Sequence, residues 1–179
     1  MVLKYILKEN DFLQAQLYDI SKNEMSTRNR IKSSIYYPII FVIVSLITFI
    51  TENISLSVFF ISLSAILFFV TYMKIKSMYF KDAIKVVKTS YKKRFNKEVV
   101  LTIEDEKIIV EDNRGKSIIN IIECKEVIET KKYFYIKMDL AYVILPKDRL
   151  ENTDMVRKKL EQISATLKVF FINDFNWQW

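Results

Sequence analysis

Few side chains in this sequence have nucleophilic chemistry, and the strongest nucleophile has no base to activate it. Cys124 is the single cysteine, and histidine is absent from the chain. A thiol attacks only as a thiolate, and histidine is the commonest base that generates one at neutral pH. We therefore expect Cys124 to be buried in a sheet, without a disulfide partner and without a catalytic role.

A cluster of carboxylates surrounds one expected hairpin and is the first candidate for a cation site. It comprises Glu104, Asp105, Glu106, Glu111 and Asp112. Their spacing does not match a calcium-binding loop, and a chain with one glycine has no glycine-rich phosphate loop. We expect a solvated turn, no metal, no cofactor and no enzymatic activity. An enzyme built from lysines and carboxylates is the remaining alternative.

Basic residues are concentrated in the first 97 residues. This part holds 15 Lys and Arg against 6 Asp and Glu, a net charge of +9, whereas residues 98–179 hold 13 against 15, a net charge of −2. A basic cluster attracts anionic lipid, by about 1 kcal/mol per residue near the surface. We expect this role for Lys74, Lys76, Lys81 and Lys85, and a plain topology signal on a solvated helix is the alternative. No nucleic-acid motif accompanies these lysines, so nucleic acid is not an expected partner.

A smaller set of cations is a candidate anion site. Lys131 and Lys132 occupy an expected turn, and Lys147 and Arg149 follow a later strand. Headgroup binding at such loops is an analogy at the level of the fold alone.

Two uncharged runs are the elements most important for positioning these side chains. Residues 35–51 and 54–73 contain no charge and are apolar on every face. At 1.5 Å per residue they are about 25 and 30 Å long, close to the thickness of bilayer hydrocarbon. With only Glu52 and Asn53 between them, they predict a transmembrane helical hairpin, with Pro38 near the start of the first helix and Asn53 capping the second. The alternative is a pair of buried helices in a soluble core.

The flanking charges predict the orientation of this hairpin. Lys22, Arg28, Arg30 and Lys32 precede the first run, several lysines follow the second, and Glu52 is the single charge between them. By the positive-inside rule both termini are cytoplasmic. We therefore expect a multi-pass membrane protein with both termini on the cytoplasmic side.

Small residues recur every seven positions on the second run. Ser57, Ser64 and Thr71 share one helix face, where small side chains let helices approach closely. Packing against the first run is one interpretation, and a homodimer seam is the other.

The remaining residues predict three cytoplasmic regions. Residues 1–30 read as a strand over Val2–Leu7 and a helix capped by Asp11, with an apolar side that needs a partner in the C-terminal region. After the membrane region 31–73, residues 74–97 continue the second helix as a basic juxtamembrane helix. Residues 98–179 predict a six-strand antiparallel meander, closed by a C-terminal helix that starts near Thr153 or Asp154. The expected fold class is an α+β membrane protein.

An aromatic tail follows that helix. Phe170, Phe171, Trp177 and Trp179 are too apolar to remain solvated, so the tail is either a docked strand or a partner-binding surface.

Several stretches together resemble one protein family. The opening KYILKENDFLQAQLYDISKN, the two apolar runs and the stretch IIECKEVIETKKYFYIKMDLAYVILPKDRL are similar to the YcxB-like family of bacterial membrane proteins. The motifs are the aromatic-rich Tyr-Phe-Tyr-Ile of residues 133–136 and the Ile-Leu-Pro-Lys of residues 144–147, whereas Asn120 departs from the tryptophan that members often carry. The resemblance implies two N-terminal spans and a C-terminal domain like bacterial pleckstrin-homology folds. The family has no settled activity, so it implies no catalytic residues.

These observations favour a membrane-anchored, non-enzymatic binding module with a protein or lipid partner at the cytoplasmic face. The alternative is an immunity protein that neutralises a toxin acting at or in the inner membrane. Gene neighbourhood distinguishes the two hypotheses.

Overall fold

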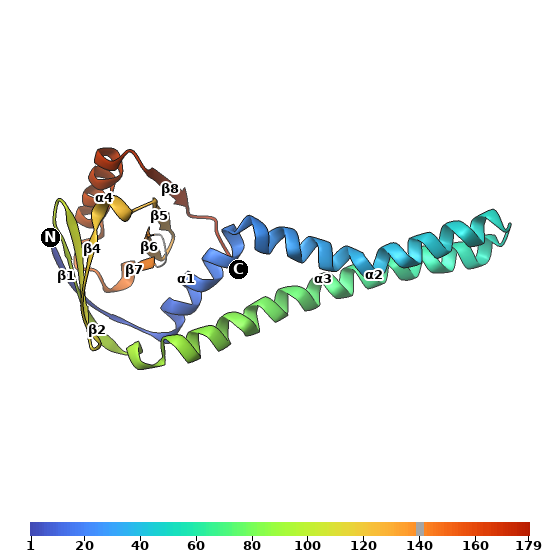
Figure 1. The fold of residues 1–179 in the computed structure, drawn as a ribbon, viewed down its shortest axis with the longest axis horizontal. Helices are drawn as coiled ribbons and strands as arrows, with labels where there is room; N and C mark the ends of the chain where they lie inside the picture. Colours follow the sequence, from blue (N-terminus) through green and yellow to red (C-terminus); the bar gives the residue numbers. More distant parts are fainter. Residues whose placement is uncertain (139–141) are drawn as a thin grey trace. The chain divides into compact units, whose positions relative to one another are not determined.

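The computed structural model describes residues 1–138 and 142–179, without the side chains of residues 24–27, 30–31 and 33–34. The Arg30 side chain, one of the flanking charges of the first apolar run, lies outside this description. The elements, in chain order, are β1 (Val2–Leu7), α1 (Glu9–Lys22), α2 (Glu24–Ile50), α3 (Ile54–Ser90), β2 (Lys97–Ile103), β3 (Lys107–Asp112), β4 (Gly115–Asn120), β5 (Glu126–Thr130), β6 (Tyr133–Lys137), β7 (Tyr142–Pro146), α4 (Thr153–Leu167) and β8 (Phe170–Asp174). Figure 1 shows this α+β arrangement.

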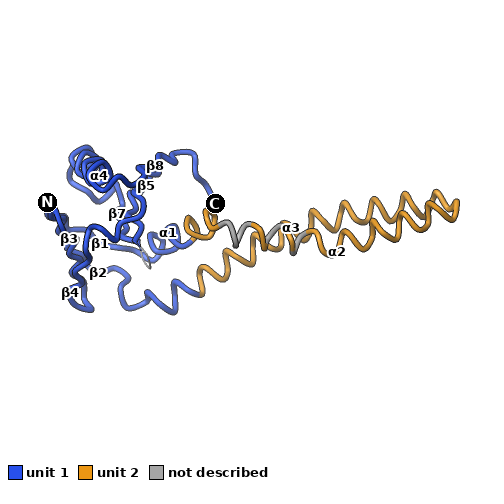
Figure 2. The backbone as a smooth tube through the Cα atoms, turned by 45° about the horizontal axis from the view of Figure 1, so that its top comes forward, with its two compact units in different colours: residues 1–16, 86–179 blue, residues 17–85 orange. Residues whose placement is uncertain are grey.

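The chain forms two compact units. Unit 1 contains residues 1–16 and 86–179, and unit 2 contains residues 17–85. Figure 2 colours them separately. The first 16 residues therefore belong to the same compact unit as the C-terminal strands.

The first sheet of unit 1 has the strand order β1-β2-β3-β4. Hydrophobic alternation explains β1, because Leu3, Tyr5 and Leu7 are buried while the residues between them are exposed. Its expected partner in the C-terminal region is β2, which runs antiparallel to it with Leu3 opposite Leu101. This pairing joins residues almost 100 positions apart in the sequence.

The second sheet has the strand order β7-β6-β5-β8, with β8 parallel to β5. Consecutive residues are buried in both β5 and β6, so both faces of these central strands are covered. The expected six-strand meander is wrong at one point. A 3-10 turn over Ile121–Glu123 separates β4 from β5, and the strands on its two sides belong to different sheets.

Helix α4 packs against β5 and β8 through Val156, Leu160 and Ile163. It starts at Thr153, as expected, and its N-cap is Asn152, whose side chain accepts a hydrogen bond from the Met155 N–H at 2.9 Å. At its C-terminus, Lys168 adopts the left-handed conformation with a φ of 54°.

Unit 2 contains the helical hairpin of α2 and most of α3. The Leu56 N–H donates to the Asn53 side chain at 3.4 Å, which confirms the expected cap of α3. Pro38 lies inside α2 rather than near its start, because α2 begins at Glu24. The expected basic helix over residues 74–97 is too long, since α3 ends at Ser90 and a 3-10 turn over Lys92–Arg94 leads into β2.

Candidate functional site

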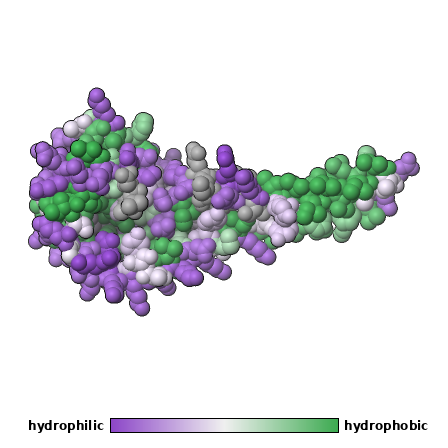
Figure 3. Space-filling model, viewed as in Figure 1, coloured by the Kyte–Doolittle hydropathy of each residue, from purple (hydrophilic) through white to green (hydrophobic). Residues whose placement is uncertain are grey.

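The hairpin carries a continuous apolar surface that no described part of the chain covers. In the most apolar window of α3, 6% of the residues are buried, although Phe59, Ile66 and Phe69 are among its large side chains. On α2, Phe49 and Ile50 are exposed in the same way. Figure 3 shows this hydrophobic surface around the end of the hairpin. Exposed apolar patches of this extent are rare on soluble monomers.

Length and hydropathy identify one described helix, α3, as long and apolar enough to cross a membrane. Residues Ile35–Ile50 of α2 form a shorter apolar stretch. A span needs about 20 apolar residues, so α2 needs helical residues that precede Ile35 to reach that length.

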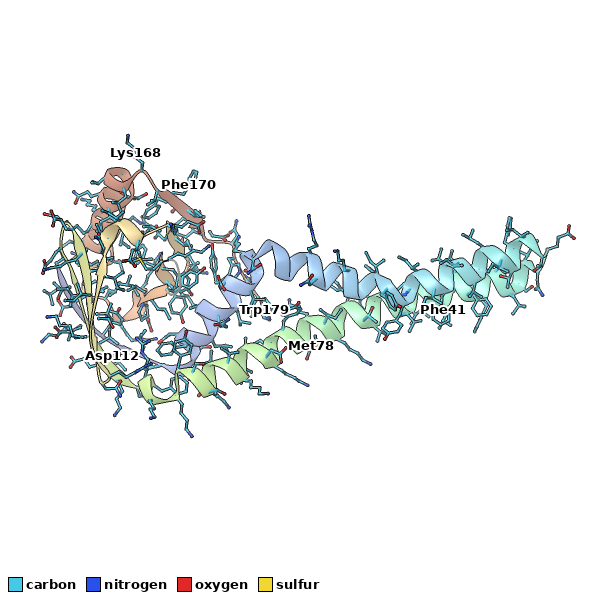
Figure 4. All side chains as sticks on the ribbon, in the orientation of Figure 1. Phe41, Met78, Asp112, Lys168, Phe170 and Trp179 are labelled. Carbon is cyan, nitrogen blue, oxygen red and sulfur yellow. The ribbon has the colours of Figure 1, made fainter. Side chains whose placement is uncertain are left out.

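Two of the three small residues on α3 bond to α2. Ser64 is buried, and its hydroxyl donates to the Pro38 carbonyl at 3.0 Å. The Ser45 hydroxyl donates to the Ser57 carbonyl at 2.9 Å, and Phe41 on α2, labelled in Figure 4, lies 6.4 Å from Phe60 between ring centroids. These contacts hold the two helices together. The Thr71 hydroxyl instead bonds within α3, to the Leu67 carbonyl at 2.8 Å.

The four lysines proposed for lipid binding are all exposed on α3. Lys74, Lys81 and Lys85 share one face of the helix, and Lys76 lies on the opposite face, because each residue advances by 100°. Along the helix axis, Lys74 and Lys76 lie within about 5 Å of Met73, whereas Lys81 and Lys85 lie about 12 and 18 Å from it.

In unit 1, a buried ion pair connects the start of α1 to the segment after β7. Asp11 is 1% exposed, and Arg149 donates to both of its carboxylate oxygens, at 2.6 and 2.8 Å. The Tyr133 hydroxyl and the Lys8 N–H also donate to this carboxylate, at 3.0 and 2.6 Å. Asp11 is therefore a residue of the first turn that caps α1 from inside the helix, and not the N-cap residue predicted from the sequence.

A second buried carboxylate lies on β5. Glu129 is 1% exposed and accepts hydrogen bonds from Lys147, at 2.6 Å, and from Arg157. The Lys147 ammonium also lies 4.5 Å from the centre of the Phe134 ring. Burial raises the pKa of the Glu129 carboxyl, but the bonds from Arg157 and Lys147 outweigh it, so this pKa lies below its usual range.

These two networks explain the aromatic and Pro-Lys motifs physically. Tyr133 begins β6 and bonds to Asp11, and Lys147 follows β7 and bonds to Glu129, so each motif supplies one partner of a buried carboxylate. Arg149, the second partner of Asp11, lies two residues after the Pro-Lys motif. Residues 103–158 match the family described as YcxB-like protein. The resemblance recognised in the sequence is therefore confirmed over this segment.

The YcxB-like segment contains Glu129, Tyr133, Lys147, Arg149 and Arg157, whereas Asp11 lies outside it. No curated protein and no solved structure matches the chain significantly.

Two of the four cations of the candidate anion site already have buried counter-ions. Lys147 pairs with Glu129, and Arg149 pairs with Asp11. Burial raises the pKa of the Tyr133 hydroxyl, and the Asp11 carboxylate raises it further. This hydroxyl is therefore a stable hydrogen-bond donor at neutral pH.

Four of the five carboxylates of the acidic hairpin cluster pair with neighbouring cations. The pairs are Glu104–Lys107, Asp105–Lys159, Glu111–Lys116 and Asp112–Arg94, at 3.3, 3.0, 2.8 and 2.8 Å. Among the described residues, no group of three or more potential metal ligands is present. These pairs account for the cluster as a charged hairpin surface.

Cys124 is buried, and its thiol lies 3.8 Å from the Glu126 carbonyl. Burial raises the pKa of this thiol to about 11. It is therefore protonated at neutral pH, which makes it a poor nucleophile.

The aromatic tail is divided between a docked strand and an exposed face. Phe171 is half-buried in β8, opposite Val127 of β5, and Trp177 and Trp179 are also half-buried. Phe170, labelled in Figure 4, is 77% exposed at the start of the strand.

Sequence reasoning missed the roles of Asp11 and Glu129. An aspartate at the start of a helix, such as Asp11, has the same neighbours in the sequence whether it is solvated or buried. The same holds for a glutamate in a strand, such as Glu129. The ion pairs of both carboxylates depend on the fold, which brings together segments that are distant in the sequence.

Proposed function

We propose that this chain is a membrane-anchored, non-enzymatic binding module of the bacterial inner membrane. In this proposal the hairpin of α2 and α3 crosses the bilayer, both termini are cytoplasmic, and unit 1 presents its surface to a protein or lipid partner. The observation that carries the proposal is the exposed apolar surface of the hairpin, of which the α3 window is 6% buried.

Solvation explains why this surface favours lipid. Each square ångström of apolar surface removed from water contributes roughly 25 cal/mol, and the exposed side chains of the hairpin are mainly isoleucine, leucine and phenylalanine. The backbone of a helix is satisfied internally, so it enters hydrocarbon without unpaired polar groups. The few hydroxyls also have partners, because Ser45, Ser62 and Ser64 donate to backbone carbonyls.

The flanking charges support the proposed orientation. Glu52 is the single charged residue in the turn between the helices, whereas lysines occupy the opposite end of α3. Lys74 and Lys76 are closest to the end of the apolar run and suit anionic headgroups best. Lys81 and Lys85 lie farther along the helix, where a bilayer attracts them less because salt screens charges beyond about 10 Å.

The architecture of unit 1 supports a binding role. Two sheets and a C-terminal helix are consistent with the expected pleckstrin-homology-like fold, although here β8 adds a parallel strand. Phe170 is the most exposed large apolar side chain of this unit and is the best candidate for a partner contact.

Single-cysteine labelling tests the topology. Glu52→Cys in intact cells should react with a membrane-impermeant maleimide, whereas Lys92→Cys, beyond the end of α3, should react only after permeabilisation. Buried Cys124 is a poor competitor for the reagent. Labelling of Lys92→Cys in intact cells would contradict the proposed orientation.

A further inference from the structure

The two edges of the first sheet, β1 and β4, differ in the hydrogen-bond partners of their outward-facing backbone N–H and C=O groups. At the β1 edge, the Ile103 N–H donates to the Met1 carbonyl at 2.8 Å. In an antiparallel pair alternate residues bond to the neighbouring strand, so Val2, Lys4 and Ile6 turn their backbone groups outward. Arg149 donates to the Ile6 carbonyl from that side. The β1 edge is therefore partly occupied by a side chain of the same molecule.

The β4 edge presents backbone groups without such a cover. The Ile121 N–H donates to the Glu106 carbonyl at 2.9 Å, so the same alternation turns the backbone of Lys116, Ile118 and Asn120 outward. Within the described residues no strand pairs with this side of β4. Ile118, at the centre of the edge, is 63% exposed. An open edge with an exposed β-branched residue is a template for another strand.

We propose that β4 of a second copy of this chain pairs antiparallel with β4, about a two-fold axis at Ile118. In this register Ile118 faces Ile118 of the second copy, and Lys116 faces Asn120 of the second copy. Each facing pair turns its backbone groups toward the other strand and exchanges two hydrogen bonds. The first sheets of the two copies then form one continuous sheet.

The sequence of the edge fits a second copy because the register is self-complementary. With a two-fold axis at Ile118, Lys116, the only cation of β4, faces the neutral amide of Asn120 of the second copy. No like charges then face each other across the two strands. Lys116 already pairs with Glu111 of its own molecule at 2.8 Å. Just beyond the strand, Ile122 is a second exposed isoleucine, at 74%. An isologous contact of this kind closes as a dimer.

A disulfide between copies tests this contact in the full-length chain. Facing residues of such a pair have Cα atoms about 5.5 Å apart, within the range that a disulfide spans. Ile118→Cys should therefore form a covalent dimer under mild oxidation. Val2→Cys, at the other edge and similarly exposed at 59%, should remain monomeric. No dimer from Ile118→Cys, or equal dimer from both variants, would overturn the proposal.

The register has its own test. Lys116→Cys and Asn120→Cys should crosslink when the two variants are co-expressed, and each should crosslink poorly when it is expressed alone. Ile118→Lys should abolish the mixed disulfide because it opposes two ammonium groups, whereas Val2→Lys should leave it unchanged. Equal crosslinking in all combinations would show random collision and overturn the register. The reaction is run in membranes and in detergent, so that its failure leaves the proposed membrane anchoring untouched.

Discussion

Asp11 and Glu129 show how single charges fix the packing of unit 1. Each carboxylate is almost fully buried, and its partners come from segments far away in the sequence. A buried charge is tolerated only when it is paired and hydrogen-bonded, so these contacts specify one arrangement of the strands. Such pairs are weak evidence for net stability, but removing one partner leaves the other charge uncompensated.

The first prediction concerns Asp11. Asp11→Asn should lower the free energy of unfolding by about 3 kcal/mol, because the Arg149 guanidinium then has no buried counter-ion. Glu9→Gln is the matched control on the same helical turn, since the Glu9–Lys88 pair is 3.9 Å long and exposed, and it should change stability by less than about 0.5 kcal/mol. Thermal unfolding followed by circular dichroism measures both. Equal stability of the two variants would rule out a structural role for the Asp11 network.

The second prediction concerns pH. The pKa of Glu129 is lower in the folded chain than in the unfolded chain, so protonation favours unfolding. The stability that Glu129 provides is therefore present above its unfolded pKa, about 4.3, and is lost as the pH falls through its folded pKa. Glu129→Gln should be less stable at neutral pH and show a smaller further loss in acid. An identical acid dependence of the unfolding midpoint in both proteins would contradict this account.

At the scale of elements, a buried hydroxyl sets the spacing of the hairpin. Ser64→Leu should push the helices apart and destabilise their packing by about 1–3 kcal/mol, because the side chain lies against the Pro38 carbonyl. Ser62→Leu is the control, since Ser62 is exposed and bonds to the Val58 carbonyl of its own helix. Spin labels on exposed Ile40 and Ile66 should report a longer distance for Ser64→Leu alone. Unchanged distances in both variants would contradict the close packing.

Two neighbouring phenylalanines of β8 are expected to have different roles, one in the stability of unit 1 and one in partner binding. Phe171→Ala should destabilise unit 1 by about 1–2 kcal/mol, because this half-buried ring covers the second sheet. Phe170→Ala should leave the unfolding midpoint almost unchanged, because the ring is largely exposed. If Phe170 contacts a partner, crosslinked capture from native membranes should fall in Phe170→Ala. Capture at the level of the unmodified chain would exclude Phe170 from that role.

Local patterns in the sequence predicted many of these elements. The period-two alternation of Val2–Leu7 and the cap at Asn53 are found in the structure. The division into two sheets was missed, because Ile121 and Ile122 of the 3-10 turn are β-branched and resemble a continuation of the strand before them. The parallel pairing of β8 with β5 was also missed, since it depends on contacts that sequence spacing does not encode.

At the scale of the whole molecule, the chain combines a charged, folded β unit with a hairpin whose large apolar side chains are exposed. The two units differ in whether their large apolar side chains are removed from water. Unit 1 buries Leu101, Tyr135 and Leu160 in its own core, whereas the exposed apolar side chains of the hairpin lack such an apolar environment within the described residues. The proposed function follows from this difference, because lipid supplies that environment for a two-helix anchor.

Alkaline extraction of membranes from cells that express the full-length chain tests this account most directly. The treatment strips proteins held by charge or by contact with other proteins but leaves helices embedded in hydrocarbon. We expect the chain to remain in the membrane pellet and to float with lipid in a density gradient. Release into the supernatant as a monodisperse soluble protein would contradict the membrane-anchored hairpin.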